Sequence, residues 1–215
     1  MEKIHLYFVP GLAASSKIFE HLKFPSHYEI HYLEWIDPLK NETVSDYSKR
    51  MCALVRHENP ILIGVSFGGI IVQEMKNYLT DSKTIIISSI KTKYEHSKLS
   101  RIAKKIRLYR LFPYLLIYAL EFSIQIFFGK KTAERIDLYR LYLSKRDYNY
   151  LKWAVRNVLN WDRTLADPKI IHIHGNKDEV FPIKYIKNCI IVNGGRHIMI
   201  LNKAKTISQL IQQAI

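Results

Sequence analysis

A serine flanked by glycines stands between a strand-like and a helix-like stretch. Residues 61–65 are four apolar residues and a glycine, and Ser66 follows in the sequence Gly-Val-Ser-Phe-Gly-Gly. A sharp turn at this point would force Ser66 into a strained backbone conformation, and its neighbours Gly64 and Gly68 are small enough to permit it. The hydroxyl would then lie at the N-terminus of a helix, where free N–H groups favour developing negative charge. The stretch therefore predicts a nucleophilic serine.

A serine hydroxyl is a weak nucleophile, so it needs a neighbouring base that a third group orients. Two late loops offer these groups. Asp178 lies three residues after Gly175, and His197 lies two residues after Gly195. Both loops follow strand-like segments, as Ser66 does, and the carboxyl ends of parallel strands meet at one edge of a sheet. The chain order Ser66, Asp178, His197 is the one expected for a serine on a strand–turn–helix.

Other residues compete for these roles. Glu179, next to Asp178, and Asp162 are alternative orienting acids. His172 and His174 share one strand face and could form a metal pair, but no acidic or thiol ligand is spaced nearby, so we expect a structural role. We expect no metal and no cofactor. The remaining histidines have no motif around them and are expected at the surface or in packing: His5, His21, His27, His31, His57 and His96.

The rest of the chain alternates between strand-like and helix-like patterns. Strands are predicted at 4–9, 28–35, 61–65, 83–88, 169–175 and 188–192. Helices are predicted at 16–22, at 43–57, from the glycines that follow Ser66 to about 79, after 182 and at 200–215. Alternating strands and helices favour a mostly parallel sheet with helices on both faces.

The alternation stops between residues 91 and 161, where only helices are predicted, at 100–112, 114–128, 132–143 and 147–159. The apolar run 111–128 contains Pro113, Glu121 and Gln125, and a membrane span needs roughly 20 predominantly apolar residues. We therefore expect a helix that faces the core or lines a groove. Its aromatic and aliphatic residues could line an acyl-binding groove or only pack the insertion onto the sheet.

Length and composition fit one domain with an insertion. The chain has 215 residues, of which 48% are hydrophobic, enough for a sizeable core. Cys52 and Cys189 lack C-x-x-C spacing, which argues against metal or redox chemistry and favours two small buried side chains. The first residues show no signal-peptide pattern, so a reducing, cytoplasmic compartment is expected.

Positive charge is concentrated in the helical insertion. The formal net charge is +14, and residues 91–156 hold 16 Lys and Arg against 5 Asp and Glu. A basic amphipathic helix suits an anionic membrane surface or an acidic carrier protein, although a solvated face would look the same. No nucleic-acid-binding motif is present, so nucleic acid is not an expected partner. The basic side chains expected on the outward face of the insertion are Lys98, Arg101, Lys104, Lys105, Arg107 and Arg110.

With these three motifs in place, the sequence resembles the α/β-hydrolase superfamily, and in particular its small, capped bacterial serine hydrolases. The matching stretches are 64–69, 174–182 and 194–197, together with Pro10-Gly11-Leu12-Ala13 where family members carry an oxyanion loop. The resemblance implies an α/β-hydrolase fold with a core at 1–90 and 162–215 and a helical cap at 91–161. The two strands that often precede the oxyanion loop are missing, so about six strands are expected.

The resemblance also assigns roles. Ser66 would be the nucleophile, His197 the general base and acid, and Asp178 the orienting carboxylate. The backbone N–H groups of Leu12 and Phe67 would form the oxyanion hole. Pro10 stands where relatives often carry a histidine, which removes a side chain but no backbone donor.

The leading hypothesis is a serine hydrolase that cleaves a carboxylic ester or thioester of a small or lipophilic substrate through an acyl-enzyme. One alternative is a non-hydrolytic binding protein or lyase-type member with the same pocket. Another is a lipid hydrolase docked to a membrane or a carrier protein.

Overall fold

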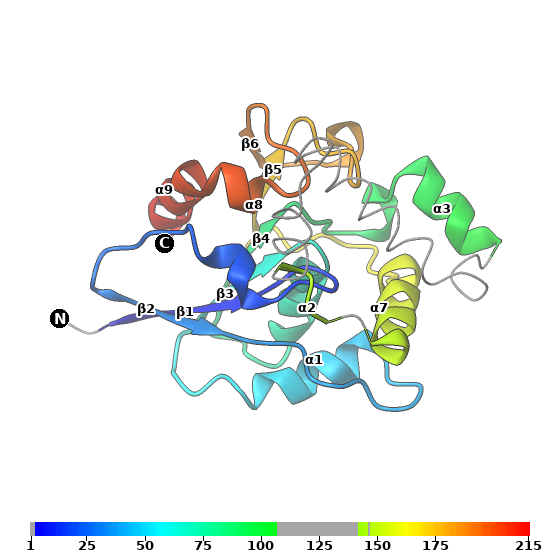
Figure 1. Ribbon diagram of the computed structural model, residues 1–215, viewed down its shortest axis with the longest axis horizontal. Helices are drawn as coiled ribbons and strands as arrows, with labels where there is room; N and C mark the ends of the chain where they lie inside the picture. The colour runs from blue at the N-terminus through cyan, green and yellow to red at the C-terminus, as the bar shows by residue number, and fades with distance from the viewer. Residues whose placement is uncertain (1–2, 107–141, 146) are drawn as a thin grey trace, which may run out of the picture.

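A computed structural model of the protein describes residues 3–106, 142–145 and 147–215 (Figure 1). The helix predicted at 114–128, most of the one at 132–143 and the end of the one at 100–112 lie outside these residues. Among the described residues, none of the helices has the length and apolar character that crossing a membrane requires.

The described strands form one parallel sheet. They are β1 (Ile4–Val9), β2 (Tyr28–Tyr32), β3 (Ile61–Val65), β4 (Lys83–Ile87), β5 (Ile171–Gly175) and β6 (Ile190–Val192). Their order is β2-β1-β3-β4-β5-β6, and every neighbouring pair is parallel. The predicted mostly parallel sheet of about six strands is thus confirmed. The strand β2 lies on one side of β1, and β3 and all later strands lie on the other. The order in which strands are added therefore reverses between β1 and β3, and ligands of open parallel sheets bind at such a switch point.

Helices cover both faces of the sheet, as predicted. In Figure 1, α1 (Val44–Cys52) and α2 (Phe67–Met75) lie on one side, and α8 (Met199–Asn202) and α9 (Ala204–Ala214) lie on the other. The helices α3 (Lys98–Lys105) and α7 (Tyr148–Asn160) lie toward the end to which β1 points. Three short 3-10 helices complete the described elements: η1 (Ser16–Phe19), η2 (Lys93–Glu95) and η3 (Ile183–Tyr185).

Several predicted boundaries were wrong, for local reasons. The closing helix predicted at 200–215 is two helices, because Lys203, with φ −116° and ψ 21°, leaves the helical conformation between α8 and α9. The helix α3 begins earlier than predicted, because Ser97 accepts a hydrogen bond from the N–H of Ser100 and caps it. The predicted cap of α1 is present, since the Thr43 hydroxyl accepts from the N–H of Asp46. The helix predicted at 16–22 is the short η1.

Part of the predicted cap packs into the core. On α7, Tyr150 and Trp153 belong to the same buried cluster as the strands. The Trp153 ring lies 4.3 Å from that of Tyr47, and its Nε1–H donates to the carbonyl of Glu42 at 2.8 Å. The division into a core and a cap at 91–161 stays a prediction.

The two cysteines are half-buried free thiols rather than fully buried ones. Burial raises the pKa of the Cys52 thiol to about 11. Cys52 is therefore a protonated thiol at neutral pH, in keeping with the structural role expected for it.

Candidate active site

The turn from β3 into α2 holds Ser66 in a strained conformation. Ser66 has φ 53° and ψ −117°, a region that costs a non-glycine residue of order 1–3 kcal/mol. The glycines permit the turn. A Cβ on Gly64 would lie 2.2 Å from the carbonyl oxygen of Gly68, and a Cβ on Gly68 would lie 2.3 Å from that of Pro10. Ser89 braces the turn, since its hydroxyl donates to the carbonyl of Ser66 at 2.7 Å.

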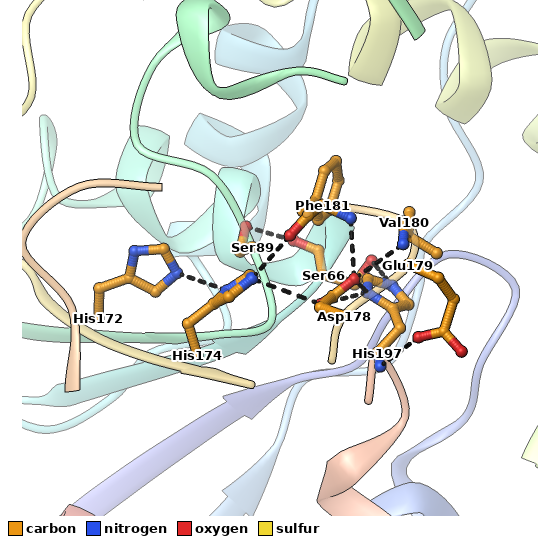
Figure 2. A network of polar contacts seen from close by, with 9 residues as sticks. All are labelled: Ser66, Ser89, His172, His174, Asp178, Glu179, Val180, Phe181 and His197. Atoms are coloured by element: carbon orange, nitrogen blue, oxygen red, sulfur yellow. Dashed lines mark hydrogen bonds and ion pairs between the residues drawn. The ribbon is translucent and has the colours of Figure 1, made fainter. Parts of the chain in front are cut away.

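The structure brings Ser66, His197 and Asp178 together in a chain of hydrogen bonds (Figure 2). His197 Nε2 lies 3.0 Å from Ser66 Oγ, and His197 Nδ1 lies 2.9 Å from Asp178 Oδ2. The side chain of Asp178 is fully buried, and that of His197 is 5% exposed. With Nδ1–H donating to the carboxylate, Nε2 is left to accept the proton of the serine hydroxyl.

The carboxylate of Asp178 is held by the backbone of its own loop. Its Oδ1 accepts from the N–H of Val180 at 2.9 Å and from the N–H of Phe181 at 2.8 Å. These two donors and His197 fix the carboxylate in one orientation, and hydrogen bonds to an ionised carboxylate are stronger than those between neutral groups.

The rival acids do not take this place. Glu179 points to the other side of the loop, where it pairs with Arg196 at 3.2 Å and accepts from the backbone N–H of His197 at 3.4 Å. Asp162 is an exposed residue just after α7. Among the described residues, only the carboxylate of Asp178 contacts the His197 ring nitrogen.

The loops that carry the acid and the base are packed backbone to backbone. A Cβ on Gly175 would lie 2.2 Å from the carbonyl oxygen of Gly195. That carbonyl also accepts from the N–H of Lys177 at 2.9 Å. On the outer side, the Asn176 side chain accepts from the N–H of Gly194 at 2.8 Å. Glycine is required here because the two chains approach too closely for a side chain.

Two buried histidines, His172 and His174, contact the loop that carries Asp178 (Figure 2). His174 Nε2 lies 2.8 Å from the carbonyl oxygen of Phe181, so this nitrogen carries the proton and donates. His174 Nδ1 then accepts from His172 Nε2–H, 3.1 Å away. Burial lowers the pKa of both rings, so both are neutral at physiological pH. The pair thus holds the backbone of this loop through the Phe181 carbonyl, which agrees with the expected structural role.

The predicted oxyanion loop, residues 10–13, lies against the turn that holds Ser66. A Cβ on Gly11 would lie 3.5 Å from Ser66 Cβ. Within the described residues, the N–H groups of Leu12 and Phe67 donate to no other group, and Phe67 is the first residue of α2, where N–H groups have no partner inside the helix. Both amides are thus free to bind an oxyanion.

Sequence reasoning missed the residue that holds this loop. Trp35 Nε1–H donates to the carbonyls of Gly11 at 3.1 Å and Ala14 at 2.9 Å, and the indole stacks on Phe67 with ring centroids 5.4 Å apart. One side chain therefore contacts both the loop of Leu12 and the residue after Ser66. A tryptophan at the end of a predicted strand was the available signal, but its contacts depend on packing that the sequence does not show.

His96 takes the packing alternative expected for it, and it does so close to the site. It is 4% exposed, and its ring packs edge-on against Phe181, which in turn packs against His197. Burial, with a smaller effect of the charge on Lys104, lowers the pKa of His96 to about 4. A neutral histidine thus lies two aromatic contacts away from the His197 ring.

Comparison with known proteins identifies the fold. No family model and no curated protein matches the sequence. Among solved structures, an epoxide hydrolase from Bacillus megaterium superposes with a TM-score of 0.71 at 13% identity, over 99% of this chain and 93% of that one. A lipase-esterase related protein from Clostridium acetobutylicum has a TM-score of 0.67 at 16% identity, over 100% and 95%. The type II thioesterase YbtT of the yersiniabactin pathway has a TM-score of 0.64 at 16% identity, over 99% and 93%. The chain therefore has the α/β-hydrolase fold.

The buried histidines predict a loss of stability in acid. The unfolded chain binds protons at histidine below a pH of about 6.5, whereas folded His96 stays neutral until about pH 4. Between these values His96 lowers the free energy of unfolding by up to about 1.4 kcal/mol for each unit that the pH falls. Urea midpoints measured from pH 7.5 to 4.5 should fall steadily below pH 6.5.

The variant His96→Asn should show a shallower fall with pH, whatever its stability at pH 7.5. The matched control is His21→Asn, at an exposed histidine, which should keep the wild-type slope. An unchanged slope in His96→Asn would contradict the assignment.

Proposed function

We propose that the protein is a serine hydrolase that cleaves a carboxylic ester or thioester through an acyl-enzyme intermediate. The observation that carries this proposal is the position of His197, 3.0 Å from Ser66 Oγ and 2.9 Å from Asp178 Oδ2. The esterase-related protein and the thioesterase of the same fold support the reaction class.

The proposed reaction has two halves. Ser66 Oγ attacks the acyl carbon while His197 Nε2 takes its proton, and the charge that develops on the imidazole is stabilised by Asp178. The N–H groups of Leu12 and Phe67 bind the oxyanion. As the tetrahedral intermediate collapses, His197 gives its proton to the leaving alcohol or thiol. Water, deprotonated by His197, then releases the acid and restores Ser66.

The acyl group is expected to be lipophilic. The apolar residues of the predicted cap that would form an acyl groove fall within 111–128, outside the described residues. Because those residues are mostly aromatic and aliphatic, we propose that rates rise from short to medium acyl chains, and a series of p-nitrophenyl esters of increasing length measures this.

Replacing the nucleophile gives the first test. Ser66→Ala should abolish turnover of p-nitrophenyl esters and of acyl thioesters, and it should abolish labelling by a fluorophosphonate probe. Ser26→Ala is the control, since Ser26 is an exposed serine with no role in the site, and this variant should still be labelled.

Labelling that persists in Ser66→Ala would refute the assignment. A wild-type protein that reacts with no acyl probe, yet is stabilised against heat by a small ligand, would instead favour the non-hydrolytic binding or lyase-type alternative.

Two adjacent acids give the second test. Asp178→Asn should lower kcat by about 10⁴-fold, because an amide favours the wrong tautomer of the catalytic imidazole. Glu179→Gln should leave kcat near the wild-type value, because Glu179 binds Arg196 and a backbone N–H instead of the ring. Steady-state kinetics on a p-nitrophenyl ester measures both, and equal losses in the two variants would contradict the proposed role of Asp178.

A second candidate, a lipid hydrolase docked on an anionic membrane surface, is favoured by α3. Leu99, Ile102 and Ile106 are 76%, 55% and 57% exposed, and their spacing places them on one face of the helix. Exposed Lys98 and Lys105 lie on the same short helix. An exposed apolar stripe beside basic residues is the pattern of interfacial helices.

Sedimentation with vesicles tests the docked form. At low salt the protein should bind vesicles of anionic but not of neutral lipid. The double substitution Lys98→Glu with Lys105→Glu should abolish binding, while Lys17→Glu with Lys205→Glu, an equal change of charge at other exposed lysines, should largely keep it. Failure to bind either vesicle would exclude a membrane and leave an acidic carrier protein as the partner to test.

A further inference from the structure

We propose that His5, His31 and His57 form a binding site for a zinc ion at the edge of the sheet, away from Ser66. The three side chains come from three elements. His5 lies on β1, His31 on the edge strand β2, and His57 on the segment between α1 and β3. One ring nitrogen from each lies within 4.8 Å of one from each of the others.

The parallel pairing of β1 and β2 places two of these residues together. Tyr7 pairs with His31 in the register, and His5 lies two residues before Tyr7 on the same face of β1. His5 Nδ1 lies 3.0 Å from His31 Nε2. The ring of His57 stacks on that of His5, with centroids 3.5 Å apart and planes within 4°.

The spacing is close to what zinc requires. With Zn–N bonds of about 2.0–2.1 Å and tetrahedral angles, two ligand nitrogens lie about 3.3 Å apart. The pair His5–His31 is already near that distance. The ring of His57 stacks face to face on that of His5, so it must turn out of the stack to direct a nitrogen at the same ion. All three rings are half-buried, which leaves a path for the ion and room for a fourth ligand.

Glu29 or water can supply the fourth ligand. Glu29 Oε1 lies 3.9 Å from His31 Nε2, and its other oxygen pairs with Lys3 at 3.3 Å. A carboxylate beside three imidazoles is a donor set that zinc accepts. It also partly offsets the positive charge of the ion.

The close packing of the three rings also favours one shared ion over three separate charges. Three imidazoles packed this closely cannot all be protonated without repulsion, whereas a single ion between them removes that conflict.

A buried tyrosine supplies the outer contact that metal-binding histidines usually have. Tyr7 Oη lies 2.5 Å from His57 Nδ1 and accepts from the N–H of Arg56 at 3.1 Å. With a metal ion on Nε2 of His57, Nδ1 carries the proton and donates to Tyr7 Oη. Such outer contacts fix the ring and its tautomer.

The role that follows is structural. An ion at this site ties the edge strand β2 to β1 and to the segment before β3. His5 precedes Val9, the last residue of β1, by four residues, or about 13 Å along the strand. The oxyanion loop leaves from the far end of that strand, so zinc binding and hydrolysis should be independent.

The test uses untagged protein, because a polyhistidine tag would itself bind zinc. Calorimetric titration with Zn²⁺ at pH 7.5 should show one ion per chain. Zinc should raise the thermal unfolding temperature, and EDTA should reverse the increase. Titration with Co²⁺ should give the strong visible absorption of a tetrahedral nitrogen site.

Matched variants locate the site. His31→Ala and His57→Ala should abolish the cobalt spectrum and the zinc-dependent stabilisation, and Tyr7→Phe should weaken zinc affinity by about 10- to 100-fold. His21→Ala and His27→Ala, at exposed histidines outside the cluster, should bind as the wild type does. Circular dichroism of each variant without metal shows whether the variant is folded. If a variant is not folded, His31→Gln is used in its place.

The proposal is overturned if untagged protein binds no stoichiometric zinc, or if His31→Ala and His57→Ala bind it as tightly as the wild type. The variant Ser66→Ala should bind zinc normally. This readout is independent of hydrolase activity, so a failure of one proposal does not affect the other.

Discussion

The close approach of backbone to backbone around α2 is the constraint on which the site depends. The start of α2 is pressed against the ends of its neighbouring strands. A Cβ on Gly68 would lie 2.3 Å from the carbonyl oxygens of both Val9 and Pro10, and one on Gly69 would lie 2.4 Å from the hydroxyl of Ser89. Because no side chain separates these segments, the N-terminus of α2, the loop after β1 and the end of β4 meet within van der Waals contact. The strained backbone of Ser66 follows from that packing.

The arrangement of the candidate site could be predicted from sequence because each part is a local motif. Gly64 and Gly68 mark the turn, and Asp178 and His197 each follow a glycine at the end of a strand-like segment. The choice between Asp178 and Glu179 was harder, because the two acids are adjacent and the sequence does not show which side chain faces His197. The structure decides it through the loop itself, whose N–H groups at Val180 and Phe181 both point at Asp178.

What sequence could not predict depends on contacts between distant segments. Trp35 bridges Gly11 and Phe67, and nothing around it in the chain indicates a partner. His5, His31 and His57 lie 26 residues apart in each step and share no motif. Strand register brings His5 and His31 together, and His57 reaches them from the segment before β3. The sheet, in contrast, was predictable, because burial on both faces makes parallel strands such as β3 continuously apolar.

The contact between Gly175 and Gly195 has a consequence for how this fold can diversify. The acid loop and the base loop share one interface, in which a carbonyl oxygen fills the space of a missing side chain. An insertion at that point in either loop would displace the other, and with it one of the two partners of His197. Changes in chain length are therefore tolerated only where they leave this contact intact. Segments that take no part in this contact are free of that constraint, and on the proposed function the predicted cap at 91–161 is where we expect substrate preference to change.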